Sequence, residues 1–303
     1  MQFGAAITGD QKSQALDAAS IVAAGGQLNE EHLAVLESIV LPNGLRPAYD
    51  ILHDSFDDLP SVWSDINAAR APLESMIRSI GRLNVVGHPS LSFIGTAFVC
   101  GDGWLMTNRH VVELVMSVKP MSLDLVFRPG LSANVDLKQE VASTDSVVLE
   151  LTGVACISTT WDAGLFKTKS LPPSAAPTPL RASKPPNIVA RTAAVIGYPA
   201  FDAAENLIQQ IQIFRGTFDK KRLEPGKING YAPIKSFGNT VTALAHDCTT
   251  LGGNSGSALI DVAEAQVFGL HFGGLESTNF AVPTWELASD PAFSKVRNQL
   301  SFV

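Results

Sequence analysis

Two stretches rich in short apolar runs are separated by a proline-rich segment, and this division most constrains what the chain can fold into. The first stretch begins at Leu83, and the second runs from Ala190 to about Val282. The segment 170–187 between them contains six prolines and shows no periodicity, which is typical of a linker. Turn sequences between the runs, such as Gly101-Asp102-Gly103, predict antiparallel hairpins. Two such units predict two β-barrels or sandwiches.

Residues 1–80 differ in character from the rest of the chain and predict a helical region. Apolar residues at helical spacing predict helices over 11–24 and 30–40, and a third helix is expected over 46–54. A fourth helix is expected to start at Pro60 and to be kinked or divided by Pro72. Its predicted buried face consists of five apolar residues, Val62, Ile66, Leu73, Ile77 and Ile80.

The excess negative charge also lies in this N-terminal region. Residues 1–80 hold 11 Asp/Glu and 4 Lys/Arg, whereas the rest of the chain holds 18 of each and is neutral. The formal charge of −7 argues against a nucleic-acid partner that binds through a general basic field. The basic run Lys220-Lys221-Arg222, which Glu224 follows closely, predicts an exposed loop.

Composition limits the class of protein further. Hydrophobic residues make up 46% of the chain and charged residues 17%, which excludes a disordered protein. Three cysteines cannot form a disulfide framework for 303 residues. The first residues lack the pattern of a signal peptide, and no apolar run approaches the ~18–20 residues that span a bilayer. We therefore expect a soluble, cytoplasmic protein without a membrane partner.

A glycine-rich run around Ser255 is the strongest local motif. The sequence Gly252-Gly253-Asn254-Ser255-Gly256-Ser257 places a serine among small residues that allow a tight turn. A serine hydroxyl is a poor nucleophile unless a base takes its proton and donors hold the oxyanion. In such a turn the N–H groups of Gly253 and Ser255 can converge on one point. Taken alone, a run of this kind also fits an ordinary turn.

A histidine and an aspartate earlier in the chain supply the residue types that such a serine needs. His110 follows the strand-like run Leu105–Thr107 directly, at the start of a helical turn, and is a candidate general base. Asp162 is flanked by apolar residues, so it is expected to be partly buried and to need a partner such as an imidazole N–H. The alternatives are a structural histidine and a surface aspartate.

The three motifs together resemble the chymotrypsin-like serine peptidases, in particular their bacterial trypsin-like and glutamyl-endopeptidase-like branch. His110, Asp162 and Ser255 follow one another at intervals of 52 and 93 residues, with the linker before the serine. The resemblance covers about residues 82–292 and rests on five segments: Gly95–Phe98, Thr107–Val111, Asp162–Leu165, Gly253–Ser257, and Val267–Gly274 followed by Asn279–Pro283.

The resemblance implies a mostly β fold with two six-stranded antiparallel barrels behind a helical N-terminal region. The implied boundaries are 1–80 for the helical region, 81–169 for the first barrel, 170–189 for the linker and 190–303 for the second barrel.

By the same resemblance, Ser255 is the nucleophile, His110 the general base and Asp162 the residue that orients the imidazole. Gly253 and Ser255 form the oxyanion hole, and neither a metal nor a cofactor is needed. Gly164 departs from the usual aspartate motif, which leaves Asp124, Asp136 and Asp145 as competitors.

Two further features concern specificity and activation. The segments that wall the substrate pocket in the family correspond here to His246–Gly252 and Leu270–Gly274, and the predicted pocket residues within them are Thr249, Thr250, His271, Phe272 and Gly273. Relatives that cleave after glutamate use a histidine and a threonine there, so the sequence predicts either acidic specificity or a preference for small aliphatic residues.

Asn254 stands where zymogen-activated members carry an aspartate that pairs with a new N-terminus. Activity is therefore expected not to require such an insertion.

The expected partners are protein or peptide substrates. Residues 1–80 are interpreted either as a regulatory module that docks a protein partner or as helices that complete the core of the first barrel. The alternative to an endopeptidase is a non-catalytic peptide-binding module on the same fold.

Overall fold

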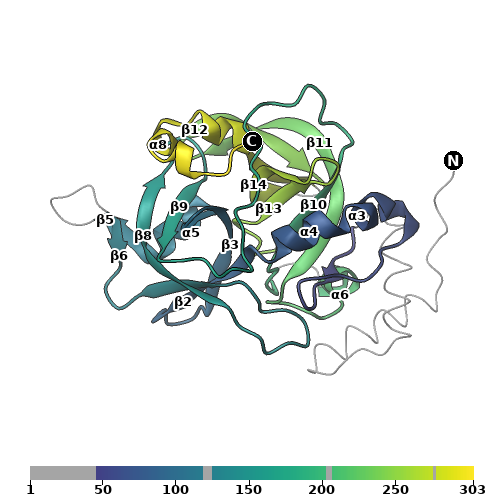
Figure 1. The fold of residues 1–303 in the computed structure, drawn as a ribbon, viewed down its shortest axis with the longest axis horizontal. Helices are drawn as coiled ribbons and strands as arrows, with labels where there is room; N and C mark the ends of the chain where they lie inside the picture. Colours follow the sequence, from purple (N-terminus) through teal and green to yellow (C-terminus); the bar gives the residue numbers. More distant parts are fainter. Residues whose placement is uncertain (1–45, 119–124, 203–206, 276–277) are drawn as a thin grey trace.

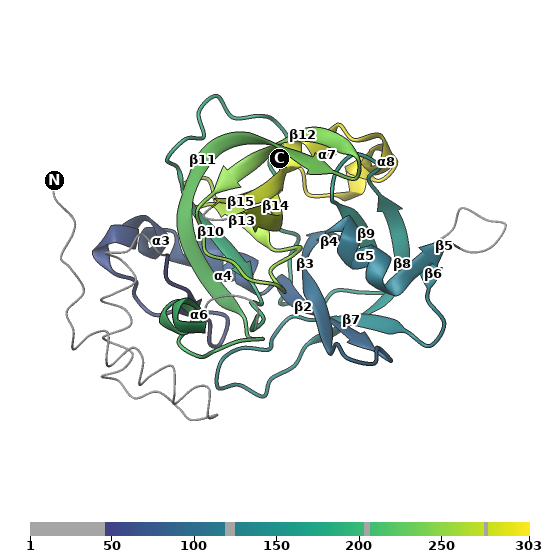
Figure 2. The same ribbon diagram turned by 180° about the vertical axis from the view of Figure 1, so that it is seen from behind.

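The computed structural model describes residues 46–118, 125–202, 207–275 and 278–303, and Figures 1 and 2 show the two sides of the molecule. The helices expected over 11–24 and 30–40 lie outside the described residues. Two β units lie side by side, with the first in blue to teal and the second in green to yellow (Figure 1).

The first unit is a closed antiparallel barrel of six strands. Its strands follow the order β2-β3-β4-β9-β8-β7 around the barrel. Their bounds are β2 Ile80–Val86, β3 Phe93–Gly101, β4 Trp104–Thr107, β7 Ser132–Asp136, β8 Val148–Ile157 and β9 Gly164–Thr168. The predicted hairpin at Gly101-Asp102-Gly103 is confirmed, because Gly101 pairs with Trp104 across it.

A short helix packs against this barrel and extends its core. α5 (Arg109–Val115) follows β4 directly and leads into a two-stranded sheet of β5 (Met116–Val118) and β6 (Leu125–Phe127). Apolar side chains from the strands and from α5 form one buried cluster, which includes Leu83, Val99, Leu105, Val111, Val112, Val115, Val135 and Phe166. Burying this cluster fixes where α5 starts relative to β3 and β9.

The second unit is a seven-stranded antiparallel sheet. The strand order is β1-β11-β10-β13-β14-β15-β12, and β12 makes an additional pairing with β11. The bounds are β1 Tyr49–Asp50, β10 Thr192–Gly197, β11 Arg222–Ser236, β12 Asn239–His246, β13 Ala258–Asp261, β14 Gln266–Leu275 and β15 Thr278–Pro283. The mostly β class and the first barrel are thus confirmed, whereas a second closed barrel stays a prediction.

The prediction of a helix over 46–54 is wrong, because this segment joins the second sheet. Tyr49 and Asp50 form β1 and pair with Leu223 and Arg222 at the start of β11. Pairing with a neighbouring strand outweighs the weak helical preference of so short a segment. The N-terminal region therefore contributes a strand to the fold as well as helices.

The helical prediction after Pro60 is correct, but the helix divides elsewhere than expected. A 3-10 helix, Ser61–Trp63, precedes α3 (Ser64–Ala68) and α4 (Arg70–Ile77), and the break falls at Ala69. Pro72 lies in the first turn of α4, where its missing N–H breaks no helical hydrogen bond. Four of the five residues of the predicted buried face are fully buried, whereas Val62 is exposed.

Residues 46–80 share a core with both β units. Ile66, Leu73 and Ile77 belong to the same buried cluster as Phe98 of β3 and Ile196 of β10. Figures 1 and 2 both show α3 and α4 lying against β10 and β11. This part of the N-terminal region is therefore an integral layer of the fold.

The proline-rich segment forms neither a long helix nor a strand, but it packs tightly. Leu180 is fully buried and forms isolated bridges with Val267 in β14 and with Phe302 near the C-terminus. The remaining helices among the described residues are α6 (Leu207–Phe214), α7 (Thr284–Ala288), α8 (Pro291–Ser294) and a 3-10 helix, Arg297–Gln299. In the described part of the chain, no helix has the length and apolar character needed to cross a membrane.

Candidate active site

His110, at the start of α5, is held by hydrogen bonds at its imidazole ring and at its backbone N–H. Its side chain is 40% exposed, and its Nδ1 lies 2.6 Å from Oδ2 of Asp162. The backbone N–H of His110 donates to the other carboxylate oxygen, Oδ1, at 3.0 Å. The buried Asn108 amide donates to the Asp162 carbonyl at 2.9 Å. The loop that carries Asp162 is thus fastened to the first turn of α5 at three points.

The structure therefore brings Asp162, and not its described competitors, to His110. Asp136 accepts hydrogen bonds from Gln139, Ser146 and two backbone N–H groups of its own loop. Burial alone would raise the pKa of Asp136, but these bonds outweigh burial and lower the pKa. Asp145 lies in an exposed part of the same loop, and Asp124 lies outside the described residues.

The unusual glycine in the aspartate motif has a packing reason. A Cβ atom at Gly164 would lie 2.9 Å from Cγ2 of Val112 in α5 and 3.0 Å from Cγ2 of Ile157 in β8. Both distances are shorter than ordinary van der Waals contact. Only glycine lets α5 settle this closely on β9, so Gly164 supports the position of His110.

The turn that carries Ser255 depends on two glycines in the left-handed region. Gly253 has φ +87° and Gly256 has φ +90°. A Cβ atom at Gly253 would lie 2.3 Å from the Tyr198 carbonyl oxygen, and one at Gly256 would lie 2.0 Å from the Thr96 carbonyl oxygen. Both backbone conformation and space thus require glycine here.

Thr96 of β3 fastens this turn to the first barrel. Its backbone N–H donates to the Ser255 carbonyl at 2.8 Å, and its hydroxyl donates to the Gly253 carbonyl at 2.8 Å. A Cβ atom at the neighbouring Gly95 would lie 2.8 Å from the Ser255 carbonyl oxygen and 3.2 Å from Cγ2 of Val111. The serine turn and the start of α5 therefore meet at this glycine, although they come from different units.

Most N–H groups of the serine turn are used within the protein. Those of Asn254, Gly256 and Ser257 donate to the carbonyls of Leu251, His271 and Asn254 at 2.9–3.1 Å. Within the described part of the chain, the N–H groups of Gly253 and Ser255 have no such acceptor. These two donors are the pair that the sequence singles out.

The predicted pocket residues lie on the loop before the serine turn and on β14. Thr249 Oγ1 accepts from the Arg46 N–H at 3.2 Å, and Thr250 Oγ1 donates to Asn279 of β15 at 2.9 Å. Phe272 and Gly273 are half-buried, and a register shift in the pairing of β14 with β15 falls at this point.

His271 is the most enclosed of the predicted pocket residues. Its side chain is almost fully buried, and its Nδ1 lies 3.3 Å from Nε2 of the buried His246. Burial lowers the pKa of His246 to about 3. Burial, followed by the neighbouring His246 and His110, also lowers the pKa of His271 well below its ordinary value. Both imidazoles are therefore neutral near pH 7.

Two residues of this region were missed by sequence reasoning. Thr96 lies in the segment Gly95–Phe98 that carries the resemblance, but the sequence assigns it no role, because that role depends on a contact between distant segments. Glu224 belongs to the charged run predicted as an exposed loop, and that prediction is wrong. Lys221, Arg222 and Glu224 are all fully buried. Glu224 accepts a hydrogen bond from the side chain of Asn254 at 2.9 Å.

Among the described residues, no group of three or more His, Cys, Asp or Glu is arranged to hold a metal ion. A closed antiparallel barrel beside a second antiparallel sheet, with a His–Asp pair and a glycine-rich serine turn meeting at their junction, defines the trypsin-like class of proteins.

Comparison with known proteins agrees with this class. Residues 95–270, more than half of the chain, match the trypsin-like peptidase domain, so the chain belongs to that family. This membership confirms the predicted class of enzyme, a serine peptidase. A probable serine protease of Lysobacter enzymogenes is 25% identical over an alignment 311 positions long, which covers 91% of this chain and 77% of that protein.

Two solved structures share the fold. Deg5 aligns with a TM-score of 0.54 at 16% identity, covering 80% of this chain and 98% of that chain. The active form of the Rv3671c protease of M. tuberculosis aligns with a TM-score of 0.51 at 20% identity, covering 78% of this chain and 87% of that chain.

Proposed function

We propose that this protein is a serine endopeptidase in which Ser255, His110 and Asp162 form the catalytic triad. The observation that carries the proposal is that Asp162 hydrogen-bonds His110 at two atoms, the ring Nδ1 and the backbone N–H. The serine turn lies beside this pair and is hydrogen-bonded to the same barrel. Holding Nδ1 in this way leaves Nε2 of the neutral ring free to accept a proton.

In the proposed reaction, Ser255 Oγ attacks the carbonyl carbon of the scissile peptide while His110 Nε2 takes the hydroxyl proton. The N–H groups of Gly253 and Ser255 donate to the oxyanion. His110 then gives its proton to the leaving amine, the C–N bond breaks, and an acyl-enzyme remains. A water molecule, deprotonated by His110, attacks the ester and releases the acid, and the proton returns to Ser255 Oγ.

We further propose that the pocket for the residue before the cleaved bond contains Thr249, Thr250, His271, Phe272 and Gly273. The backbone around Gly273 would pair with an extended substrate as an added strand. A neutral His271 can donate one hydrogen bond to a substrate carboxylate, which supports a preference for glutamate or aspartate. Its nearly complete burial instead supports small aliphatic residues, which would fill the pocket without reaching that ring.

Regulation and location belong to the proposal too. Because residues 46–80 are packed into the core, they support the interpretation that these helices complete the fold. A regulatory partner site in the acidic region 1–80, and a cytoplasmic location, stay predictions.

The test is labelling of the purified protein with a fluorophosphonate probe, together with cleavage of a peptide library. Wild type should be labelled and should cleave peptides. Ser255→Ala should be neither labelled nor active. His110→Ala should lose turnover while circular dichroism shows that it remains folded. Ser75→Ala, at an exposed position of α4, is the matched control for removal of a hydroxyl. Absence of labelling in the folded wild type would favour a peptide-binding module without catalysis.

The same library decides specificity. If His271 contacts a substrate carboxylate, cleavage after glutamate or aspartate should predominate, and His271→Gln should reduce it more than cleavage after alanine or valine. A wild-type preference for small aliphatic residues would remove this role from His271.

A further inference from the structure

The residue before the proposed nucleophile is anchored inside the second unit. Asn254 is fully buried, and its side-chain Nδ2 donates to Oε1 of Glu224 at 2.9 Å. Its Oδ1 lies 3.4 Å from the Ser257 hydroxyl. A Cβ atom at Gly197 would lie 2.2 Å from the same Oδ1, so the backbone of β10 closes the remaining side. The amide thus occupies a closed slot with one fixed orientation.

The turn needs such an anchor because Asn254 and Ser255 have a glycine on each side, Gly253 before them and Gly256 after them. Gly253 and Gly256 adopt φ values of +87° and +90°, and glycine passes between backbone conformations at little energetic cost. Without side-chain anchors, rotation at these glycines would redirect the N–H groups of Gly253 and Ser255. Thr96 holds the carbonyls of the turn from the first barrel, and Glu224 holds Asn254 from the second.

Glu224 itself is set in the sheet and is not free to move. It lies on β11, where it pairs with Val195 of β10. Its side chain is fully buried, and Oε2 has no hydrogen-bond partner among the described residues. Besides this one hydrogen bond, Glu224 interacts electrostatically with the buried Arg222. Burying a glutamate for packing alone is unfavourable, since an apolar residue of similar volume would avoid the desolvation cost.

We propose that Glu224 is a positioning residue that orients the oxyanion-binding turn through the side chain of Asn254. This inference rests on the proposed function, because it assigns the turn its oxyanion role. The interaction lies within the folded chain and needs no cleavage and no new N-terminus.

The proposal is tested with three variants of the full chain that vary the donor and the acceptor of this hydrogen bond. Glu224→Met removes the acceptor and should lower kcat about 10- to 100-fold, with KM changing less than about threefold. Asn254→Asp places two carboxyl groups in contact and should lower kcat at least as much. Asn254→Asp combined with Glu224→Gln exchanges the amide and the carboxyl group, restores the hydrogen bond, and should recover at least about tenfold of the loss.

Controls separate positioning from stability and from the proposed function. Glu150→Met, an exposed glutamate of β8, is the matched control and should leave kcat unchanged. Thermal unfolding verifies that each variant is folded at the assay temperature. The positioning role is wrong if folded Glu224→Met keeps the wild-type kcat, or if the exchanged pair is no more active than Asn254→Asp alone. If wild type itself shows neither turnover nor fluorophosphonate labelling, the proposed function fails, and the positioning role of Glu224 fails with it.

Discussion

At the scale of single residues, the environment of His110 is the part of the site that sequence reasoning anticipated best. The residue types and their order predicted a base beside a partly buried carboxylate, and the structure places Asp162 there with its side chain 9% exposed. The distances could not be predicted, because they depend on Gly164 admitting α5 against β9. Gly164 departs from the usual aspartate motif because a larger residue there would collide with Val112 and Ile157.

The first prediction concerns Asp162. Asp162→Asn replaces one carboxylate oxygen by an amide that cannot accept from the His110 ring, so the ring loses its fixed tautomer. We expect kcat to fall by about 10³–10⁴ with little change in KM. Steady-state kinetics on a peptide amide checks this, and Asp145→Asn, an exposed aspartate, is the matched control. A near-normal kcat for Asp162→Asn would exclude the proposed role.

At the scale of elements, the strands and hairpins of the first barrel follow from local patterns, but the N-terminal segment does not. Within the segment 46–54, Tyr49 and Asp50 form a strand because β11 offers them an unpaired edge. The Arg222 guanidinium, fully buried on that strand, donates to the Ala48 carbonyl at 2.6 Å and forms an ion pair with Asp50. Such partners lie too far away in the sequence for local propensity to reveal them.

The second prediction concerns α4, whose buried face joins the core of both units. Leu73→Ala removes a fully buried side chain from this shared cluster and leaves a cavity. The free energy of unfolding should fall by about 2–5 kcal/mol, measured by urea denaturation. Ser75→Ala, at an exposed position of the same helix, should change it by less than about 0.5 kcal/mol. Equal effects of the two substitutions would contradict an integral role for α4.

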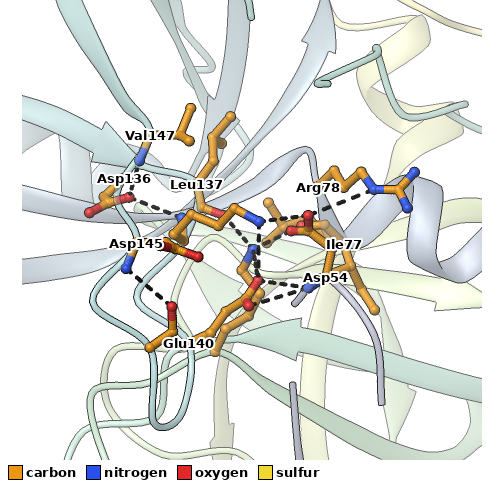
Figure 3. A network of polar contacts seen from close by, with 12 residues as sticks. Asp54, Ile77, Arg78, Asp136, Leu137, Glu140, Asp145 and Val147 are labelled. Carbon is orange, nitrogen blue, oxygen red and sulfur yellow. Dashed lines mark hydrogen bonds and ion pairs between the residues drawn. The ribbon is translucent and has the colours of Figure 1, made fainter. Parts of the chain in front are cut away.

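At the scale of the whole molecule, a buried polar network connects the N-terminal segment with both β units (Figure 3). Lys221, just before β11, donates to the carbonyls of Ile77 at 2.9 Å and Leu137 at 2.5 Å. Glu140 lies 4.0 Å from the Lys221 ammonium and 3.8 Å from that of Lys138. Lys138 also contacts Asp54 at 2.6 Å. Three distant segments therefore meet around one buried ammonium group.

The third prediction is a pH dependence that arises from this network. Burial lowers the pKa of Lys221 from 10.5 to about 8, although Glu140 and Asp54 act in the opposite direction and Lys138 adds to the lowering. Between these two values the unfolded chain binds a proton that the folded chain has released. Stability from this group therefore rises with pH across that window, by up to about 3 kcal/mol, and is constant below it.

The measurement compares wild type with Lys221→Met by urea denaturation from pH 7 to pH 10.5. The difference in unfolding free energy should shift in favour of wild type as the pH rises above about 8. Subtracting the unfolding free energy of the variant from that of wild type at each pH removes the contribution of other titrating groups. Lys220→Met, next to it in sequence, supplies the matched control. A difference that is flat or that moves in the other direction would contradict the prediction.

The sequence by itself determined the division into two β units, the mostly β class, and the order and types of the residues proposed for catalysis. These depend on local information, namely short apolar runs, turn residues and compact motifs, which act over a few neighbouring positions. Only the tertiary structure decided that Asp162 lies at His110, that Thr96 holds the serine turn, and that Glu224 lies buried against Asn254. Each of these facts depends on contacts between residues 30 to 159 positions apart, where pairing and burial outweigh local preference.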